Sequence, residues 1–476
     1  MKAITCLPLA MVLLLPTWAL AQENRIFASP PVNTPPLAAA ELVLRARTAT
    51  PDFKRLSLFR DARAGELAFN LFDDLSLTGE VRRVESLGSA EYTLSGVIPR
   101  TLGGNFTISV VDNSIWADIQ VPGKVAARVR MLPNGACAIE QMDDPRIVSC
   151  SGGIVPGPNS PDGDAGRVGG FEERSACPEP DGRFDIAVFW TPAAETAAGG
   201  ESAIRSVINA AVTRANDAYA NSGVSTRMRL VYAARTEYTE AADMTTDLNR
   251  LTNCCDGFMD EVHPRRNAFG ADFVHVVTNT GSGIAWLYTP GDPAFSGKAF
   301  SVGKWDRIST TWTLAHEVGH NMGCNHNLAD AGNPPVGWFP YSLGWFWTGN
   351  SGTQWGSVMS YVGTRVAQFS NPDVNFDGQP TGNRNNFGVL IAANAQTLNF
   401  TDQASANWRN PVYAQKAYSG IETGCEATPW NTLSEALNTV DSGGAVIMKA
   451  GSGMETGTFS TACTIRAEGG NATIGR

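Results

Sequence analysis

The sequence predicts an α/β (α+β) fold for its central part, with a β-rich segment on each side. Apolar residues alternate in 184–190, recur at helical spacing across 203–221 and alternate again in 228–232, which indicates a strand, a helix and a second strand. The run 273–277 is short, apolar and β-branched, as a buried central strand requires. A helix across 311–322 follows it. Because many α/β folds begin with a strand, a helix and a second strand, this pattern alone does not identify the fold family.

The flanking segments show period-two patterns. In residues 22–150, apolar side chains alternate along several runs that are separated by Gly and Pro turns. From about 151, Gly, Pro, Ser and Asp replace apolar residues, which predicts an exposed linker. Arg167 and Arg174 then offer accessible backbone to a processing protease. The tail, 410–476, combines one helical stretch with short strands.

The first 21 residues have the pattern of a secretory signal peptide. Lys2 gives a positive start, residues 6–15 form an apolar core, and Ala19-Leu20-Ala21 is the small-x-small site that signal peptidase recognises. The apolar run is too short to cross a bilayer, which takes roughly 20 residues. We therefore expect a secreted, extracellular protein without a membrane partner.

Composition limits the other partners. The 476 residues are 43% apolar, enough for two or three globular units. The formal net charge is −10, and loss of the signal peptide with Lys2 leaves 35 − 46 = −11. An acidic exported chain is not expected to bind nucleic acid or anionic lipid through a basic patch. No pattern in the sequence indicates an oligomeric state.

A histidine-rich segment holds three of the five histidines in the chain. On a helix, His316 and His320 lie four residues apart on one face, so both imidazoles can bind one metal ion. Gly323 permits the strained turn that brings His326 back as a third nitrogen ligand. Glu317 is placed to act on a water at the fourth position, not as a ligand. The spacing H-E-x-x-H-x-x-G-x-x-H predicts a catalytic Zn²⁺ site and is the metzincin signature.

Residues 183–409 resemble a reprolysin-type (adamalysin-like) metzincin of the secreted bacterial kind. Ser357-Val358-Met359-Ser360-Tyr361 resembles the Met-turn, and Gly283-Ile284-Ala285-Trp286 resembles the edge strand that binds substrate. Phe369-Ser370-Asn371-Pro372 resembles a segment that follows the Met-turn. The resemblance implies a catalytic domain, 175–409, with a twisted mixed sheet, a zinc helix and a structural methionine, Met359, beneath one Zn²⁺.

The same resemblance implies an organisation and a reaction. Residues 22–174 would be a propeptide, and the tail is similar to a fragment of a β-helix. The substrates would be proteins or peptides that lie antiparallel to the edge strand. A zinc-activated water would attack the peptide bond with Glu317 as general base. The alternative is a non-enzymatic secreted binding protein with an inactive metzincin domain and a polysaccharide-binding tail. The complete set of ligands and base favours the enzyme.

Three positions near the motifs carry further expectations. Asn327 follows the third histidine, where reprolysins commonly have Asp, and Ser282 precedes the edge strand, where related chains can carry Cys. Neither change touches a reacting group. Tyr361 either approaches the metal, as a ligand or a donor to the transition state, or packs in the core beneath the turn. Both roles remain open for Tyr361.

Eight cysteines follow the signal peptide, an even number that indicates disulfides in an exported protein. We expect two local pairs, with the remaining four cysteines paired among themselves: Cys137–Cys150 and Cys425–Cys463, then Cys177, Cys254, Cys255 and Cys324. No thiol would then be left for a cysteine switch, in which Cys137, Cys150 or Cys177 would block the zinc. The propeptide is therefore expected to inhibit sterically by covering the edge strand.

Two further sequence patterns are weaker. Asp373-Val374-Asn375-Phe376-Asp377-Gly378 resembles the start of an EF-hand loop, but the twelfth position is Arg384 and not Glu, so Ca²⁺ is weakly supported. Two histidines lie outside the zinc motif. His275 is expected in the core and His263 at the surface.

Overall fold

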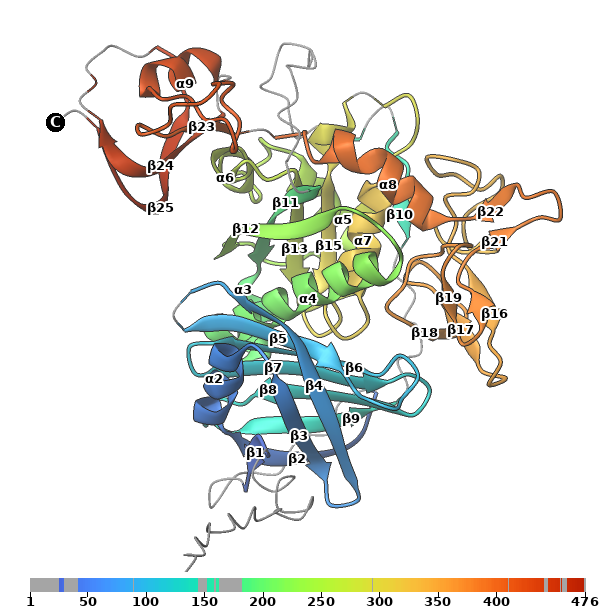
Figure 1. Cartoon of the computed structure of the whole chain (residues 1–476). Helices are drawn as coiled ribbons and strands as arrows, with labels where there is room; N and C mark the ends of the chain where they lie inside the picture. Colours follow the sequence, from blue (N-terminus) through green and yellow to red (C-terminus); the bar gives the residue numbers. More distant parts are fainter. Residues whose placement is uncertain are drawn as a thin grey trace, which may run out of the picture.

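The computed structural model describes residues 25–29, 42–88, 90–143, 152–157, 160–161, 182–292, 294–409, 411–440, 444–453, 455 and 460–474. The expected signal peptide, Arg167 and Arg174 lie outside these ranges. Figure 1 shows an N-terminal β-sheet, a central α/β unit and a small C-terminal unit. In the described part of the chain, no helix is long and apolar enough to span a membrane.

The N-terminal unit is one antiparallel sheet of nine strands in the order β1-β2-β9-β8-β7-β6-β5-β4-β3. Helix α2 (Phe53–Ala62) begins where the Asp52 side chain accepts a hydrogen bond from the N–H of Arg55. Alternate side chains of the sheet, such as those of Leu94 and Ile119, form the core. The strands are β1 (Phe27–Ala28), β2 (Val43–Pro51), β3 (Gly65–Phe72), β4 (Leu75–Ser86), β5 (Glu91–Val97), β6 (Asn105–Val111), β7 (Ser114–Val121), β8 (Val125–Met131) and β9 (Cys137–Met142).

The central unit contains a mixed sheet in the order β10-β14-β15-β13-β11-β12. All neighbours pair in parallel except β14 and β15, which are antiparallel. The expected strand, helix, strand and buried strand are all present, as β11, α4, β12 and β13. The sheet strands are β10 (Gly153–Ile154), β11 (Arg183–Trp190), β12 (Arg227–Arg235), β13 (Phe273–Thr278), β14 (Gly283–Trp286) and β15 (Phe300–Lys304).

Helices cover this sheet on both faces. Helix α7, where the sequence predicts the zinc helix at 311–322, spans Thr313–Asn321 and contacts β14 and β15. Helix α4 spans Glu201–Asn221 and contacts β12 and α7. The other helices of the unit are α3 (Pro192–Ala198), α5 (Met244–Thr252), α6 (Val262–Phe269), η1 (Phe295–Lys298) and α8 (Asn394–Ser405).

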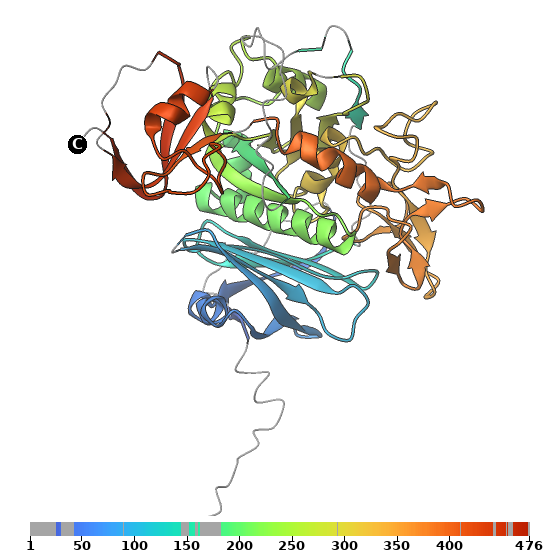
Figure 2. The ribbon, with the colours of Figure 1, turned by 45° about the horizontal axis from the view of Figure 1, so that its top comes forward.

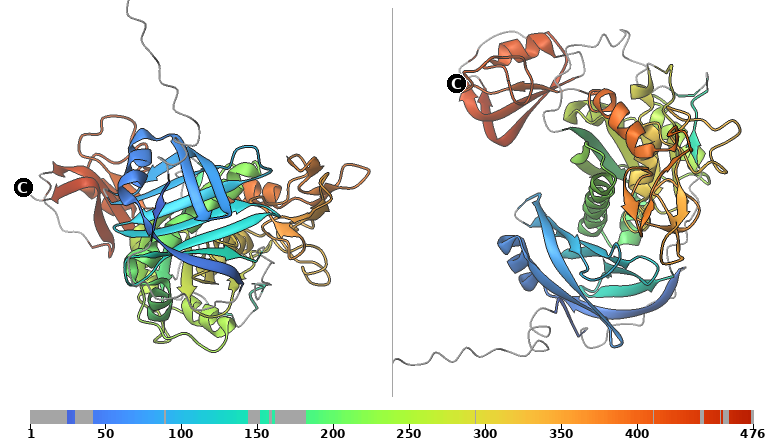
Figure 3. Two further views of the ribbon diagram at one scale, coloured as in Figure 1. Left: turned by 90° about the horizontal axis from the view of Figure 1, so that it is seen from below. Right: turned by 45° about the vertical axis from the view of Figure 1, so that its right-hand side comes forward.

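Helix α4 is buried along most of its length because it lies between the two large sheets. Figure 1 places it against the N-terminal sheet, and Figures 2 and 3 show the same packing from other directions. Its apolar residues, including Ile204 and Ile208, pack in the core of the central unit. Its polar residues face the N-terminal sheet, where Asn209 donates to Glu91 (2.7 Å) and Thr213 donates to Thr93 (3.2 Å).

A buried polar cluster joins the two units beside α4. The Asp118 carboxylate on β7 accepts hydrogen bonds from the hydroxyls of Ser309 and Thr310, which lie just before α7. The guanidinium of Arg214 donates to the carbonyl of Ser309 (3.0 Å) and to Gln120 (2.8 Å), and its Nε lies 4.0 Å from Asp118. Because Asp118 and Arg214 are almost completely buried, each depends on the other for charge compensation.

The C-terminal unit has a parallel sheet of β23 (Val412–Ala414), β24 (Ala445–Gly453) and β25 (Thr464–Ile474), covered by α9 (Leu433–Thr439). Its small core includes Leu437, Val446 and Met448. Arg183 on β11 forms an ion pair with Glu426 (2.5 Å), which ties this unit to the central sheet. The helical stretch and short strands that the sequence predicts for the tail are present, as α9, β24 and β25.

The segment between α7 and α8 contains several short strands: β16 (Phe346–Thr348), β17 (Gln354–Gly356), β18 (Thr364–Arg365), β19 (Asn375–Phe376), β20 (Gln379–Pro380), β21 (Asn383–Arg384) and β22 (Leu390–Ala392). The segment that resembles a calcium loop forms the β19–β20 hairpin. Asp373 pairs with Arg384 (2.6 Å), and Asp377 accepts from the indole of Trp355 (2.8 Å). Calcium binding stays a prediction.

Replacing Asp118 with alanine should weaken the fold of the full chain. The substitution leaves the buried Arg214 without its nearest carboxylate and Ser309 and Thr310 without an acceptor. We expect the free energy of unfolding to fall by about 3–5 kcal/mol. Denaturant unfolding, in a Glu317→Gln background that prevents self-digestion, measures this change.

Ser202→Ala is the matched control, because the Ser202 hydroxyl on α4 donates one hydrogen bond to the exposed carboxylate of Asp112 (2.8 Å). Its loss should cost about 1 kcal/mol or less. Equal losses for Ser202→Ala and Asp118→Ala would contradict the importance of the buried cluster.

Candidate zinc centre

Helix α7 and the turn after it bring three histidines together. His316 and His320 lie one turn apart on α7. The helix ends at Asn321, and Gly323 has a φ of +90°, the left-handed conformation that the sequence analysis expects of it. A Cβ at Gly323 would lie 2.7 Å from Cβ of Trp338, so the turn is also sterically closed to other residues. His326 follows this turn and faces the helix.

The three imidazoles point their Nε2 atoms at one centre. The Nε2 atom of His326 lies 3.1 Å from that of His316 and 3.0 Å from that of His320. In each ring, Nδ1 can donate to a main-chain carbonyl: Val358 for His316 (2.8 Å), Cys324 for His320 (2.8 Å) and Asp330 for His326 (3.3 Å). These bonds assign the hydrogen to Nδ1, which leaves three Nε2 lone pairs facing one another.

This arrangement fits a zinc ion and does not fit mutual hydrogen bonding. Three converging acceptors without a proton between them repel one another unless a cation lies at the centre. Tetrahedral ligands with Zn–N bonds of 2.0–2.1 Å would lie about 3.3 Å apart, close to the observed separations. Burial lowers the pKa of all three histidines, to about 4 for His326. The imidazoles are therefore neutral and keep their lone pairs for a metal at neutral pH.

The Met-turn lies against α7. Met359 is fully buried, and a Cβ at Gly319 would lie 3.0 Å from its Sδ atom. The hydroxyl of Tyr361 lies 2.7 Å from Nε2 of His326. The Tyr361 hydroxyl therefore lies beside the metal position, which is the first of the two locations that the sequence left open for this residue. Asn327 joins the two segments, because its side chain donates to Asp330 (2.7 Å) and accepts from the N–H of Tyr361 (2.9 Å).

Glu317 faces the strand that the sequence predicts to bind substrate. The segment Gly283-Ile284-Ala285-Trp286 forms β14, and all four residues are buried. A Cβ at Gly283 would lie 2.2 Å from Oε1 of Glu317, so only glycine lets this carboxylate reach the strand. At the other end of β14, the indole of Trp286 donates to Thr252 (2.8 Å) in the core. The side chains of β14 are therefore packed in the interior, and the sequence prediction that this strand binds substrate stays a prediction.

Comparison with known proteins identifies this site. Residues 205–327 match the Metallo-peptidase family M12B Reprolysin-like. A peptidyl-Asp metalloendopeptidase of Stenotrophomonas maltophilia is 30% identical over 307 residues, which cover 62% of this chain and 71% of that protein. The chain belongs to the reprolysin-like metallopeptidases. A protein of the same name from Xanthomonas campestris pv. campestris is 30% identical over 323 residues, covering 66% of this chain and 73% of its own length. This reprolysin-like chain is thus a zinc metallopeptidase that hydrolyses peptide bonds.

In the structure of this reprolysin-like peptidase, a short strand covers the edge of β14 close to a zinc-motif histidine. Strand β10 pairs in parallel with β14, Gly153 opposite Ala285 and Ile154 opposite Trp286, and the N–H of Leu287 donates to the carbonyl of Ile154 (2.8 Å). A Cβ at Gly153 would lie 2.6 Å from Nδ1 of His320. The sequence predicts an exposed linker from 151, so for residues 152–154 that prediction is wrong. The segment Gly152-Gly153-Ile154-Val155 could have indicated this strand, because two glycines before two β-branched residues suit a close backbone approach.

Several cysteine and histidine predictions need correction. Cys425 is disulfide-bonded while Cys463 is a free thiol, so the expected Cys425–Cys463 pair is wrong. Four further cysteines are also free thiols, which overturns the expectation that none remains: Cys137, Cys254, Cys255 and Cys324. His263 is buried against the ring of Phe300 and not at the surface. His275 is a core residue as predicted, bonded to Ser301 (2.8 Å), and burial lowers its pKa to about 3.

Sequence reasoning also missed a basic residue beside the histidines. Arg365 on β18 donates to the carbonyls of Thr311 (2.8 Å) and Ser360 (3.2 Å), which bridges the loop before α7 to the Met-turn. Its positive charge contributes to the lowered pKa of His316 and of His326, although burial contributes most. No spacing pattern in the sequence links this position to the zinc motif.

Removal of one imidazole should lower zinc content, and removal of the thioether should not. We expect His326→Ala to lose most of its zinc, because two neutral nitrogens bind far more weakly than three. Met359→Leu keeps the ligands and the buried volume, so it should retain about one zinc ion per chain. Elemental analysis of the purified proteins after dialysis gives both values. Full zinc content in His326→Ala would remove His326 from the ligand set.

Proposed function

We propose that this chain is a secreted endopeptidase in which Glu317 is the general base, made as a precursor with residues 1–21 as signal peptide and 22–174 as propeptide. The observation that carries the proposal is the position of Glu317. Its carboxylate is fully buried, one residue from His316, and faces Gly283 of the edge strand. A base at this point lies between the metal ligands and any peptide that pairs with β14.

The residues of the chain divide the work of hydrolysis. His316, His320 and His326 hold the zinc, which when bound supplies a Lewis acid for the scissile carbonyl and lowers the pKa of a water. Glu317 takes a proton from the attacking water and passes it to the leaving amine. Strand β14 aligns the substrate antiparallel through main-chain hydrogen bonds. The hydroxyl of Tyr361, beside His326, is placed to donate to the developing oxyanion.

The rival function is a non-enzymatic binding protein with an inactive site. The complete triad, the buried Glu317 and relatives named metalloendopeptidases all count against it. Hydrolysis of casein by the processed chain, blocked by a chelator and restored by zinc, would support the enzyme. Stoichiometric zinc with no hydrolysis of any protein would support the binding protein.

The names of the relatives suggest where this chain cuts. Both proteins compared above are called peptidyl-Asp metalloendopeptidases. We therefore extend the proposal to cleavage beside aspartate in extracellular proteins or peptides.

Latency is proposed to be steric, with β10 as the blocking element. Segment 152–157 occupies the edge of β14 and approaches His320, where a substrate would have to lie. It runs parallel to β14, opposite to the direction expected for a substrate, so its peptide groups are presented in reverse. A thiol block by Cys137 is not compatible with the fold, because Cys137 is fully buried in the core of the N-terminal sheet. Release would follow cleavage near Arg167 or Arg174.

Glu317→Gln should retain zinc and lose activity. The amide has nearly the same shape but cannot accept a proton from water, and general-base help is typically worth about 10²–10⁴-fold. Peptide hydrolysis by the processed protein, normalised to its zinc content, measures the loss. Turnover within about tenfold of the wild type would assign the proton transfer to another group.

Gly153→Val should activate the uncleaved precursor. The valine Cβ would lie 2.6 Å from Nδ1 of His320, so β10 cannot pair with β14 in its present position. We expect the intact precursor to hydrolyse a fluorogenic peptide at a rate near that of the processed enzyme. Mass spectrometry confirms that the chain is uncut during the assay.

Gly157→Val is the control for this experiment, because no atom lies within 4 Å of a Cβ at Gly157. That precursor should stay as inactive as the wild type. If Gly153→Val is equally inactive before cleavage and active after it, β10 is not the element that blocks the cleft.

A further inference from the structure

One face of helix α4 is polar although the helix lies inside the molecule. Arg205, Asn209, Thr213 and Asp217 recur at every fourth position of the sequence, so they lie along one face of the helix. A helix at a protein surface usually turns such a stripe toward water. Here the stripe faces the N-terminal sheet (Figure 1), and each of the four side chains contacts that sheet. The stripe is therefore a docking surface for the N-terminal unit.

The charges on the two sides of this surface are complementary. Glu91 on β5 pairs with Arg205 (2.7 Å) and also accepts a hydrogen bond from Asn209 (2.7 Å). About three turns further along the helix the signs are reversed, because Arg83 on β4 pairs with Asp217 (2.9 Å). Opposite signs at two points fix the register in which the sheet meets the helix, since a slipped arrangement would bring like charges together.

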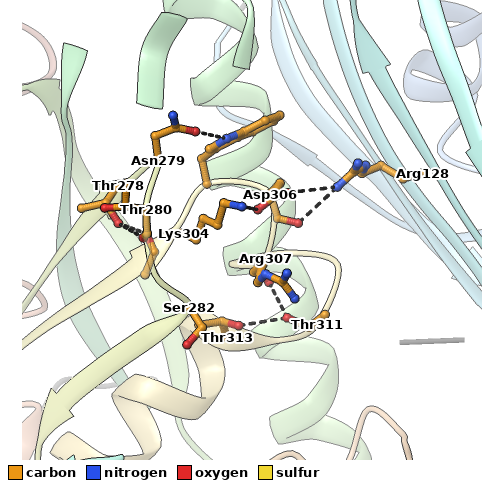
Figure 4. A network of polar contacts seen from close by, with 12 residues as sticks. Arg128, Thr278, Asn279, Thr280, Ser282, Lys304, Asp306, Arg307, Thr311 and Thr313 are labelled. Carbon is orange, nitrogen blue, oxygen red and sulfur yellow. Dashed lines mark hydrogen bonds and ion pairs between the residues drawn. The ribbon is translucent and has the colours of Figure 1, made fainter. Parts of the chain in front are cut away.

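The loop before α7 extends this surface. Asp118 on β7 accepts from the hydroxyl of Thr310 (2.8 Å), and Gln120 on the same strand donates to the carbonyl of Thr310 (3.2 Å). Arg128 on β8 donates to the carbonyl of Asp306 (3.4 Å) and lies 3.9 Å from its carboxylate, as Figure 4 shows. Together with the contacts on α4, these bonds are as numerous as the roughly ten direct hydrogen bonds of a typical interface between separate proteins.

A tryptophan of the N-terminal sheet packs in the core of the central unit. Trp116 on β7 is 1% exposed and belongs to the apolar core of the central unit rather than to the core of its own sheet. Its ring meets the ring of Trp305 edge-on, with 6.0 Å between the centroids. Buried Trp and Arg side chains contribute most of the binding energy in complexes of separate chains. The two units are therefore joined by an apolar contact that paired charges surround.

The expected cleavage sites follow β10 in the sequence. Arg167 and Arg174 come after Gly153–Ile154, so a cut at either arginine leaves β10 covalently attached to the N-terminal unit. While that unit stays docked, the short connection between β9 and β10 keeps β10 near β14 at an effective concentration on the order of 1 mM. Ile154 also packs against the core of the central unit, which adds an apolar contact to the strand pairing. Cleavage alone therefore does not remove β10 from the edge strand.

We propose that the N-terminal unit stays bound to α4 and to the loop before α7 after the linker is cut, and that it holds β10 on the edge strand as a separate, inhibitory polypeptide. This inference rests on the proposed precursor organisation and deepens it by naming the surface that retains the inhibitor. Cleavage in the linker is then the first of two steps. Processing is complete only when the N-terminal unit has been removed.

The first test measures docking without using activity. The full chain carries Glu317→Gln, which prevents self-digestion, and a site for a sequence-specific protease inserted between Gly169 and Gly170. After the cut, we expect both fragments to elute together on size-exclusion chromatography at about 1 μM, because specific interfaces of standard size have dissociation constants below about 0.1 μM. A denaturing gel of the eluted protein identifies the two fragments. Separate elution of the fragments would overturn the proposal.

Charge reversal tests the surface itself. Glu91→Lys and Arg205→Glu each bring like charges together, so each should raise the concentration at which the cut fragments separate by about tenfold or more. The double variant restores an opposite pair and should recover most of the wild-type affinity, a rescue that misfolding of one fragment cannot produce. Glu80→Lys is the matched control, because Glu80 pairs with Arg82 of its own strand (2.9 Å) and should leave docking unchanged. Wild-type affinity in Glu91→Lys would overturn the assigned surface.

The inhibitory role is tested with Glu317 restored. The cut and docked enzyme should hydrolyse a fluorogenic peptide no faster than the uncut precursor, and the cut Glu91→Lys enzyme should become active on dilution as its fragments separate. Mass spectrometry confirms that the N-terminal fragment is intact during the assay. Full activity of an intact, docked complex would overturn the inhibitory role. A catalytic fragment that is free of the N-terminal unit, retains zinc and hydrolyses no peptide would instead refute the endopeptidase function.

Discussion

The mutual repulsion of three imidazole lone pairs is the constraint on which the rest of the structure depends. Nitrogen atoms 3.0–3.1 Å apart stay in place only because each ring is fixed from behind by a main-chain carbonyl. Val358 lies at the Met-turn, Cys324 at the glycine turn and Asp330 in the loop that follows. The metal position therefore fixes three chain segments relative to α7, and Asn327 adds a further bond between two of them.

Neighbouring residues of the loop before α7 contact two different parts of the structure. Ser309 and Thr310 donate hydrogen bonds to Asp118 of the N-terminal sheet. Thr311 contacts the main-chain carbonyl of Arg307 and the guanidinium of Arg365. Docking of the N-terminal unit thus holds the start of the zinc helix from one side, while β10 covers β14 from the other. Both contacts are made by residues that precede the catalytic domain in the sequence, so the proposed propeptide would both support the zinc helix and cover the edge strand.

The zinc centre was predictable because its signal is local. His316, Glu317, His320, Gly323 and His326 occupy eleven consecutive residues, and helix geometry and the freedom of glycine define their relative positions. The strand pattern of 184–190 and 273–277 was predictable for the same reason. The disulfide pairing was not, because cysteine parity carries no information about distance, and Cys137 is buried as a thiol in the core of a sheet. The burial of His263 depends on Phe300, which is distant in sequence.

What the sequence by itself determined is the chemistry: a zinc-binding helix, a base beside it, and a membership in the reprolysin-like family that the relatives then showed. What only the tertiary structure decided is which distant segments of the chain pack beside that site. The pairing of Gly153 with Ala285 and the hydrogen bond between Asp118 and Thr310 join residues from distant parts of the chain. Short-range periodicity reports which face of an element is buried, but it cannot report which element covers that face. The packing of whole sheets and loops decides that, through burial of apolar surface and compensation of buried charge.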